Sequence, residues 1–260
     1  TIVTDGSGST VLGAAVGEST ALGSLEVGAE GSEGNVTVNG VVTESGPISV
    51  YGGDLTIEGN LDSGNGEITL RANGELSTAS GGNRTIQSGS GDIHLLAETL
   101  VFDGGAANNT TVTSTGVLTI APSETSTDGF KNVGSQIEFE GSVTSDQYAS
   151  IAADTNGLII DGVSTLGGLT IGADGGYITN SASDAGSRVR FEIDSGDFEI
   201  NGPVTIYGYD VTVADSGSTS RFGTQSGNIL LKAGNNISLD GRVRATSSTL
   251  TLDAGGTVTQ

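Results

Sequence analysis

The chain has few histidine, lysine and cysteine side chains that could act as a catalytic base or nucleophile. It has one histidine, His94, two lysines, Lys131 and Lys232, and no cysteine. Enzymes that cleave acidic polysaccharides need paired carboxylates, or bound calcium beside a basic residue, and no Asp-Asp pair occurs in this sequence. His94 stands between Ile93 and Leu95, so strand alternation predicts an outward-pointing surface histidine. We therefore expect no catalytic residue and no bound cofactor.

The 31 acidic residues are the groups that could hold a cation. The glycine-rich nonapeptide of calcium-binding β-rolls is absent, and Gly89-Ser90-Gly91-Asp92 is only a fragment of it. The sequence also lacks an EF-hand loop. Carboxylates from separate parts of the fold could still converge on an ion, so a metal site stays open, and calcium is the ion that such a site would take.

Tyrosine rings could provide stacking surfaces for sugars. Tyr207 and Tyr209 are two residues apart, so in a strand they would lie on the same face. Tyr177 precedes Ile178, which the alternation predicts to point inward. An exposed strip formed by Tyr177, Tyr207 and Tyr209 is therefore our glycan-contact hypothesis. Packing of these rings at corners of the fold is the alternative.

The charge of the chain excludes several classes of partner. Its 260 residues include 9 Lys+Arg and 31 Asp+Glu, which gives a formal net charge of −22. This charge repels nucleic acid phosphates and anionic lipids, so we expect neither nucleic-acid binding nor membrane insertion. No stretch approaches the roughly 18 apolar residues of a membrane span, and residues 1–16 do not resemble a signal peptide. With no cysteine, these features fit a mature or excised segment of an exported protein.

An internal repeat indicates which elements position these residues. Residues 227–260 align with themselves at an offset of 21, which matches Ile229 with Leu250 and Ile237 with Val258. The repeated pattern, called the frame below, has apolar residues at i and i+2 and usually a small residue at i+4. It recurs about every 22 residues, as in solenoid proteins. Its matches begin at Leu25, Ile48, Ile68, Ile93, Leu118, Ala149, Leu169, Phe191, Val211, Ile229 and Leu250.

Each repeat contains two or three short strands, separated by dipeptides such as Asn39-Gly40 and Asp240-Gly241. These dipeptides are also typical of hairpin turns, but a hairpin meander would not explain the recurring frame. We therefore predict an all-β fold, a parallel β-helix that spans residues 1–260 as one segment, with about 22 residues per coil and roughly 11 coils. In residues 188–194 apolar and charged side chains alternate, so the apolar ones should point inward.

Four irregular segments are rich in Ser, Thr, Asn or Gly and are expected to leave the coil as loops. They could carry binding contacts, or they could simply be irregular corners. The stretch from 118 to 149 could also hold an additional coil at Ile137 and Phe139. The four segments are residues 104–115, 122–135, 179–186 and 215–227.

The last third of the chain carries a family resemblance. The strings Gly227-Asn-Ile-Leu-Leu-Lys-Ala-Gly-Asn-Asn-Ile-Ser-Leu-Asp-Gly241 and Thr249-Leu-Thr-Leu-Asp-Ala-Gly-Gly-Thr-Val-Thr-Gln260 resemble the repeats of filamentous-haemagglutinin-type exoproteins and of autotransporter passengers. The resemblance implies a right-handed parallel β-helix, displayed on or secreted from a Gram-negative cell and often used in adhesion. Neither that family's amino-terminal secretion domain nor a carboxy-terminal barrel has a counterpart in the sequence, so no secretion route is predicted.

These observations predict an extracellular, non-catalytic β-solenoid, a structural or adhesive shaft segment of a bacterial cell-surface exoprotein. Expected partners are a host-cell, glycan or matrix ligand, neighbouring cells, further coils of the same chain, or head-to-tail copies. Two alternatives remain at this point. One is a filament subunit that stacks head to tail, and the other is a β-helical enzyme that acts on polysaccharides.

Overall fold

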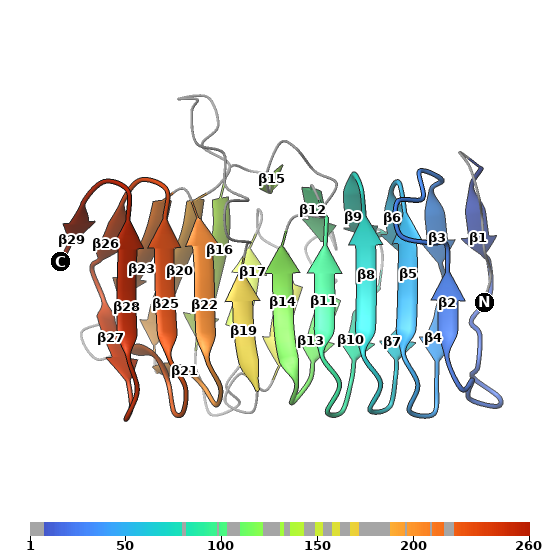
Figure 1. Ribbon diagram of the computed structural model, residues 1–260. Coiled ribbons are helices and arrows are strands. Elements are labelled where there is room, and N and C mark those ends of the chain that lie inside the picture. Colours follow the sequence, from blue (N-terminus) through green and yellow to red (C-terminus); the bar gives the residue numbers. More distant parts are fainter. Residues whose placement is uncertain are drawn as a thin grey trace.

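The computed structural model describes residues 8–79, 82–97, 99–102, 110–121, 131–132, 136–142, 149–152, 158–161, 167–171, 188–195, 197–208, 210–215 and 221–260. The described residues form strands, turns and irregular connections. The strands stack in parallel along one axis as a β-solenoid (Figure 1). The predicted all-β, parallel coiled architecture is therefore confirmed.

The longest wholly parallel sheet has nine strands, and each strand pairs with the one a turn away. Partner residues are 20 to 25 positions apart from β2 to β14 and again from β22 to β28, which agrees with the predicted period. Longer connections precede β19 and β22. The nine strands are β2 (Leu25–Val27), β5 (Ile48–Gly52), β8 (Ile68–Ala72), β11 (Ile93–Leu96), β14 (Val117–Ala121), β19 (Gly168–Ile171), β22 (Val204–Gly208), β25 (Ile229–Ala233) and β28 (Leu250–Ala254).

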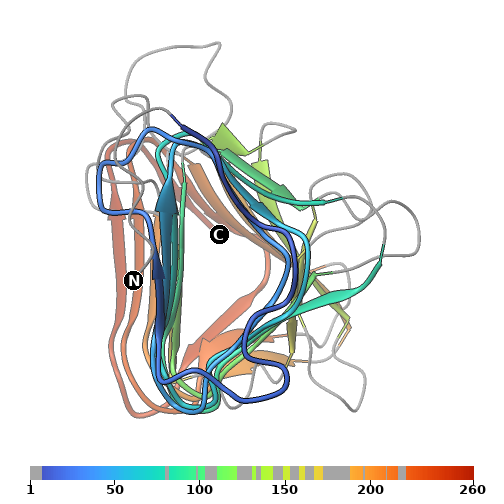
Figure 2. The same ribbon diagram turned by 90° about the vertical axis from the view of Figure 1, so that its right-hand side faces the viewer.

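Two shorter sheets form further walls, and the view along the axis shows the walls around a common interior (Figure 2). The six-stranded sheet belongs to the N-terminal part of the chain and the three-stranded sheet to the C-terminal part. The former contains β1 (Thr10–Leu12), β3 (Val36–Val38), β6 (Leu55–Ile57), β9 (Glu75–Thr78), β12 (Thr99–Phe102) and β15 (Lys131–Asn132). The latter contains β21 (Asp197–Ile200), β24 (Arg221–Thr224) and β27 (Arg242–Ala245).

The remaining sheet has eleven strands and one reversal of direction. Strand β17 runs antiparallel to both of its neighbours and thereby joins two parallel runs. The region around Ile137 and Phe139 thus adjoins an antiparallel strand. In spatial order the strands are β4 (Val41–Val42), β7 (Leu61–Asp62), β10 (Arg84–Gln87), β13 (Thr110–Thr113), β18 (Leu158–Asp161), β17 (Ala149–Ala152), β16 (Gln136–Ser142), β20 (Arg188–Ser195), β23 (Asp210–Asp215), β26 (Ile237–Leu239) and β29 (Val258–Thr259).

The repeating frame treats its eleven matches as equivalent strands of successive coils, but three of them lie in a different sheet from the others. Ala149, Phe191 and Val211 lie in β17, β20 and β23 of the eleven-stranded sheet, whereas Val204 takes the expected place in the nine-stranded sheet. Apolar alternation occurs in every wall, so the frame alone does not identify the wall. The nine-stranded sheet accordingly does not confirm a count of eleven coils.

Strands also occur inside three of the four expected loops. Residues 104–115 include β13, residues 122–135 include β15, and residues 215–227 include β24. Residues 179–186 lie outside the described residues, as do the side chains of the alternating segment 188–194. The dipeptide Asn39-Gly40 is a corner, because β3 and β4 on either side of it belong to different sheets.

The core is a set of aligned columns of inward-pointing aliphatic side chains. In the nine-stranded sheet, Ile48, Ile68 and Ile93 stack in register and are completely buried, and the column continues through Leu118 and Ile229. Each such side chain contributes roughly 1.5–3 kcal/mol by burial. Since that burial depends on the turns above and below, stability comes from the stack as a whole.

A column of glycines runs along the corner that leads into the nine-stranded sheet. Each glycine stands two residues before the first inward-pointing aliphatic residue of a strand, from Leu25 of β2 to Ile229 of β25. A Cβ on Gly46 would lie 1.5 Å from the carbonyl oxygen of Gly23, and one on Gly202 would lie 1.5 Å from that of Gly167. Successive turns therefore pack backbone against backbone here. The column comprises Gly23, Gly46, Gly66, Gly91, Gly116, Gly167, Gly202 and Gly227.

Substitution of Gly202 by alanine should lower the free energy of unfolding by about 2–4 kcal/mol, because the new methyl group overlaps backbone that has no room to move. Gly23 is the matched control: it belongs to the same column, but a Cβ there meets nothing within 4 Å. Gly23→Ala should change stability by no more than about 0.5 kcal/mol. Urea unfolding followed by circular dichroism measures both. Equal effects of the two substitutions would contradict the packing described.

Candidate functional site

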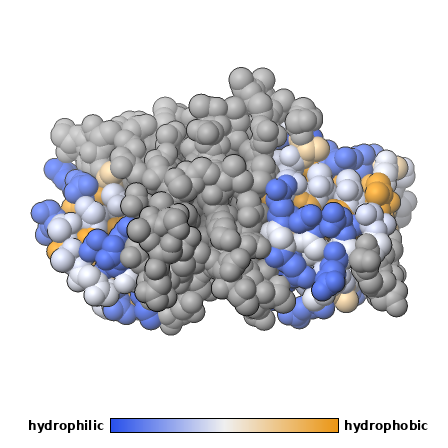
Figure 3. Space-filling model, turned by 90° about the horizontal axis from the view of Figure 1, so that it is seen from above, coloured by the Kyte–Doolittle hydropathy of each residue, from blue (hydrophilic) through white to orange (hydrophobic). Residues whose placement is uncertain are grey.

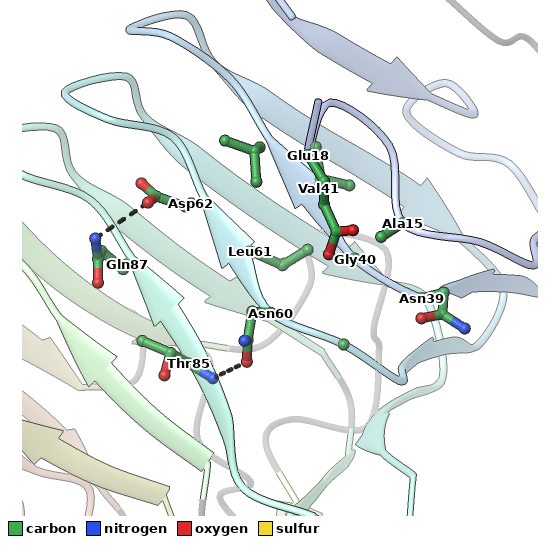
Figure 4. Close-up of a pocket in the computed structure, with 12 residues that line it drawn as sticks. Ala15, Glu18, Asn39, Gly40, Val41, Asn60, Leu61, Asp62, Thr85 and Gln87 are labelled. Atoms are coloured by element: carbon green, nitrogen blue, oxygen red, sulfur yellow. Dashed lines mark hydrogen bonds between the residues drawn. The ribbon is translucent and has the colours of Figure 1, made fainter. Parts of the chain in front are cut away.

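A polar hollow of about 410 Å³ lies on the eleven-stranded sheet near the N-terminal end of the described chain (Figure 4). Strands β4, β7 and β10 form its floor, and the segment around Ala15 to Glu18 forms one side. Backbone hydrogen bonds hold that segment: Val16 N donates to Gly40 O, and Val42 N donates to Val16 O, each at 2.9 Å. The lining residues are Ala15, Glu18, Asn39, Gly40, Val41, Val42, Gly59, Asn60, Leu61, Asp62, Thr85 and Gln87.

Hydrogen bonds between successive turns orient the polar groups of the hollow. Gln87 Nε2 donates to Asp62 Oδ2 at 3.2 Å, and the other Asp62 oxygen accepts from Gly64 N at 2.9 Å. Asn60 Oδ1 accepts from Thr85 N at 2.9 Å (Figure 4). Carboxylate and amide groups are thus fixed beside one another in an open depression, which Thr85 also lines. Such a set can donate and accept hydrogen bonds with a neutral, polyhydroxylated ligand.

Asx residues hold corners elsewhere in the same way. In each case a side-chain oxygen accepts from a backbone N–H one turn further along the chain. The acceptor–donor pairs are Asn35 with Asp54, Asp54 with Glu75, Asp92 with Val117, Asp210 with Asn236, Asn228 with Thr249, and Asn236 with Thr257. The polar groups of the hollow thus belong to a wider set of contacts between turns.

The outer face of the nine-stranded sheet carries the lone histidine in a row of small polar side chains. Thr69, His94 and Thr119 are in-register neighbours, as are Thr119, Thr170 and Thr205. The prediction that His94 points outward is confirmed, since it is half-buried between the buried Ile93 and Leu95.

Glu67 connects two residues of this row. Thr69 Oγ1 donates to Glu67 Oε1 at 2.8 Å, and His94 Nε2 lies 3.9 Å from the same oxygen. The threonine proton is directed to the carboxylate, so Thr69 and His94 do not form a nucleophile–base pair. Asp92 precedes β11 as Glu67 precedes β8, which makes the two carboxylates neighbours in register, but Asp92 Oδ1 is occupied by Val117 N at 2.8 Å.

The structure places one of the three candidate glycan-contact tyrosines. Tyr207 lies half-buried on β22, and its register partner on β25 is Lys232, whose Nζ is 3.9 Å from Asp253 Oδ2. The positions next to Tyr207 on the following strands are therefore occupied by charged side chains, not by a second aromatic ring. Tyr177 and Tyr209 lie outside the described residues. The hollow has no aromatic lining among its described residues, and the tyrosine pattern did not point to it.

Two further searches concern the described part of the chain. Within it, no group of three or more His, Cys, Asp or Glu side chains is arranged to hold a metal ion. The same residues contain no helix that is long and apolar enough to span a membrane. In comparisons with known proteins, no family model, no curated protein and no solved structure matches the chain.

Asn60 tests how strongly the turn-to-turn contacts hold the hollow. Asn60→Ala should lower the free energy of unfolding by about 1 kcal/mol, because Thr85 N–H loses its acceptor. Asn60→Asp retains an acceptor oxygen and should recover most of that loss. Chemical denaturation of the two variants provides the comparison. If the aspartate variant lost as much stability as the alanine variant, the hydrogen bond would not be what holds this corner.

Proposed function

We propose that this chain is a shaft segment of an extracellular bacterial β-solenoid, a non-catalytic, right-handed parallel β-helix with a structural and adhesive role. The observation that supports it best is the unbroken register of the nine-stranded sheet, which makes the chain a rod. Nine strands about 4.8 Å apart extend for about 38 Å. A rod of stacked turns can hold binding groups away from a surface and repeat them along its length.

The outer surface suits exposure to water and to polar ligands. Seen from above, the described surface at both ends of the rod is a mixture of hydrophilic (blue) and intermediate (white) residues with small hydrophobic spots (Figure 3). Outward positions of the nine-stranded sheet carry mainly hydroxyl-bearing and charged side chains, such as Ser49, Thr119 and Thr205. The proposal of filamentous-haemagglutinin-type relationship, secretion and cell-surface location rests on the repeat strings of the last third of the sequence.

The hollow is the proposed adhesive contact. Its orienting hydrogen bonds leave Asp62, Gln87 and Asn60 beside open space, and Glu18 adds a second carboxylate on the covering segment. A glycan of a host cell, matrix or neighbouring cell could exchange hydrogen bonds with these groups. Many weak contacts of this kind, repeated on a rod or on many rods, add up to strong attachment.

A second candidate function is a filament subunit that stacks head to tail. The last strands carry apolar side chains that are less covered than their register partners: Leu250 is 37% exposed and Val258 48% exposed, whereas Ile229 and Ile237 are fully buried. A further coil of the same chain or a second copy could cover them. Sedimentation velocity at high protein concentration tests the filament version, which a purely monomeric species would contradict.

The adhesive proposal predicts that the rod binds neutral glycans through the hollow. Asp62→Ala should reduce the response on a neutral-glycan array about tenfold or more, since it removes a carboxylate and releases Gln87. Glu67→Ala is the matched control, because it removes the same charge from another wall and should leave binding within about twofold. Absence of any bound neutral glycan, or equal loss in both variants, would rule out the hollow as the contact.

A further inference from the structure

The charge of this acidic protein is unevenly distributed along the rod. Residues 8–97 contain eleven acidic side chains and two basic ones, Arg71 and Arg84. Residues 221–260 contain four of the nine basic side chains of the whole chain and only two acidic ones, Asp240 and Asp253. The C-terminal part is therefore locally positive in a protein whose formal charge is −22.

Three of these basic residues lie on the three-stranded sheet, in the C-terminal part of the rod (Figure 1). Phe222 and Thr224 of β24 point into the core and are fully buried, so the alternate residues point outward. On β27 both Arg242 and Arg244 are exposed. We call the outward residues Arg221, Arg242 and Arg244 the arginine wall.

The register places like charges side by side in this wall. Arg221 of β24 pairs directly with Arg242 of β27, so their Cα atoms are about 4.8 Å apart. Directly opposed like charges weaken a sheet. Asp197 of β21 is the register partner of Arg221 on the other side, one strand further from Arg242.

Arg244 has its own counter-charge. Its Nη1 lies 3.6 Å from Glu199 Oε1, two strands away. Gly223 stands between them in register, and a Cβ there would lie 2.4 Å from Arg244 O. Because Gly223 has no side chain, the pair can meet across β24. In register, Arg242 lies two strands from Asp197 of β21, one strand further away than Arg221.

We propose that the arginine wall binds an anionic polysaccharide, through sulfate or carboxylate groups that contact Arg242 and its neighbour Arg221. The planar guanidinium group forms paired, charge-assisted hydrogen bonds with both kinds of anion. An anion between the two arginines also relieves their mutual repulsion. An open, flat wall suits an extended chain, which can contact successive strands. This site is separate from the hollow and does not depend on the proposed neutral-glycan contact.

The charge of the acidic N-terminal part does not prevent this binding. Strands β11 and β25 are four strand spacings apart in the nine-stranded sheet, which is about 19 Å. The Debye length at physiological ionic strength is about 8 Å, so most of the field of the acidic N-terminal part is screened at the wall. A polyanion that would be repelled by the N-terminal part can therefore be held at this end.

Biolayer interferometry with the complete 260-residue chain tests the proposal, with immobilised dextran sulfate in one arm and polygalacturonate in the other. Arg242→Gln should weaken binding about fivefold or more, and Arg242→Lys, which keeps the charge but loses the planar fork, by about twofold to threefold. Lys232→Gln removes the same charge from the nine-stranded sheet and should change binding by less than about twofold. The arm with the stronger response identifies the anionic group.

Several outcomes would overturn the proposal. One is a parent chain that binds neither polymer at about 150 mM salt, the ionic strength at which the field of the acidic N-terminal part is screened. Another is a loss in Lys232→Gln equal to that in Arg242→Gln, which would indicate net charge alone. Tighter binding to duplex DNA than to both polysaccharides would assign the wall to a different partner. Salt-sensitive self-association that disappears in Arg242→Gln, measured by sedimentation without any polysaccharide, would assign it to a second copy.

Discussion

Close stacking of the backbone at one corner is the constraint on which the rest of this structure depends. Neighbouring turns are about one strand spacing apart, and at the corner before the nine-stranded sheet no space remains for a Cβ from Gly46 to Gly227, whereas Gly23 in the first turn of the column is open. A glycine therefore stands there in every turn from Gly46 to Gly227. This constraint sets the register of the strands that follow, which in turn aligns the aliphatic columns of the core. It also explains part of the high glycine content of the chain, 44 residues.

Polar side chains complete the same corners. The buried hydroxyls of Thr43, Ser63, Ser88 and Ser114 donate to glycine carbonyls at 2.6–2.8 Å, so this backbone remains satisfied away from water. Asx side chains accept from the next turn on the outer side of the corners. Because such corners need small and polar residues, the chain can be only 34% hydrophobic and still form a continuous core. Polar residues that stabilise the stack also supply the groups of the hollow.

The sequence predicted the fold class and period, because the aliphatic alternation repeats wherever a wall needs a core column. It treated Ala149, Phe191 and Val211 as equivalent to the other frame matches, although they lie in a different sheet, because all walls share that alternation. The glycine column contains the missing signal: Gln147, Val189 and Tyr209 stand two residues before these three positions, where the nine-stranded sheet requires glycine up to β25. The hollow could not be predicted, since its lining comes from turns up to 72 positions apart in the sequence. The arginine wall was missed because β24 lies in the segment 215–227, which was expected to be a loop.

The account rests on parallel stacking, and a cysteine-free chain allows a direct test by spin labelling. Ser49, Thr205 and Thr251 lie in one outward row, on β5, β22 and β28. Pulsed electron–electron resonance on the pairs Ser49→Cys/Thr205→Cys and Ser49→Cys/Thr251→Cys should give distances of about 24 Å and 34 Å, five and seven strand spacings. A separation that increases by about two spacings between the pairs supports the stack. Equal distances, or a shorter distance for the pair with the greater sequence separation, would contradict it.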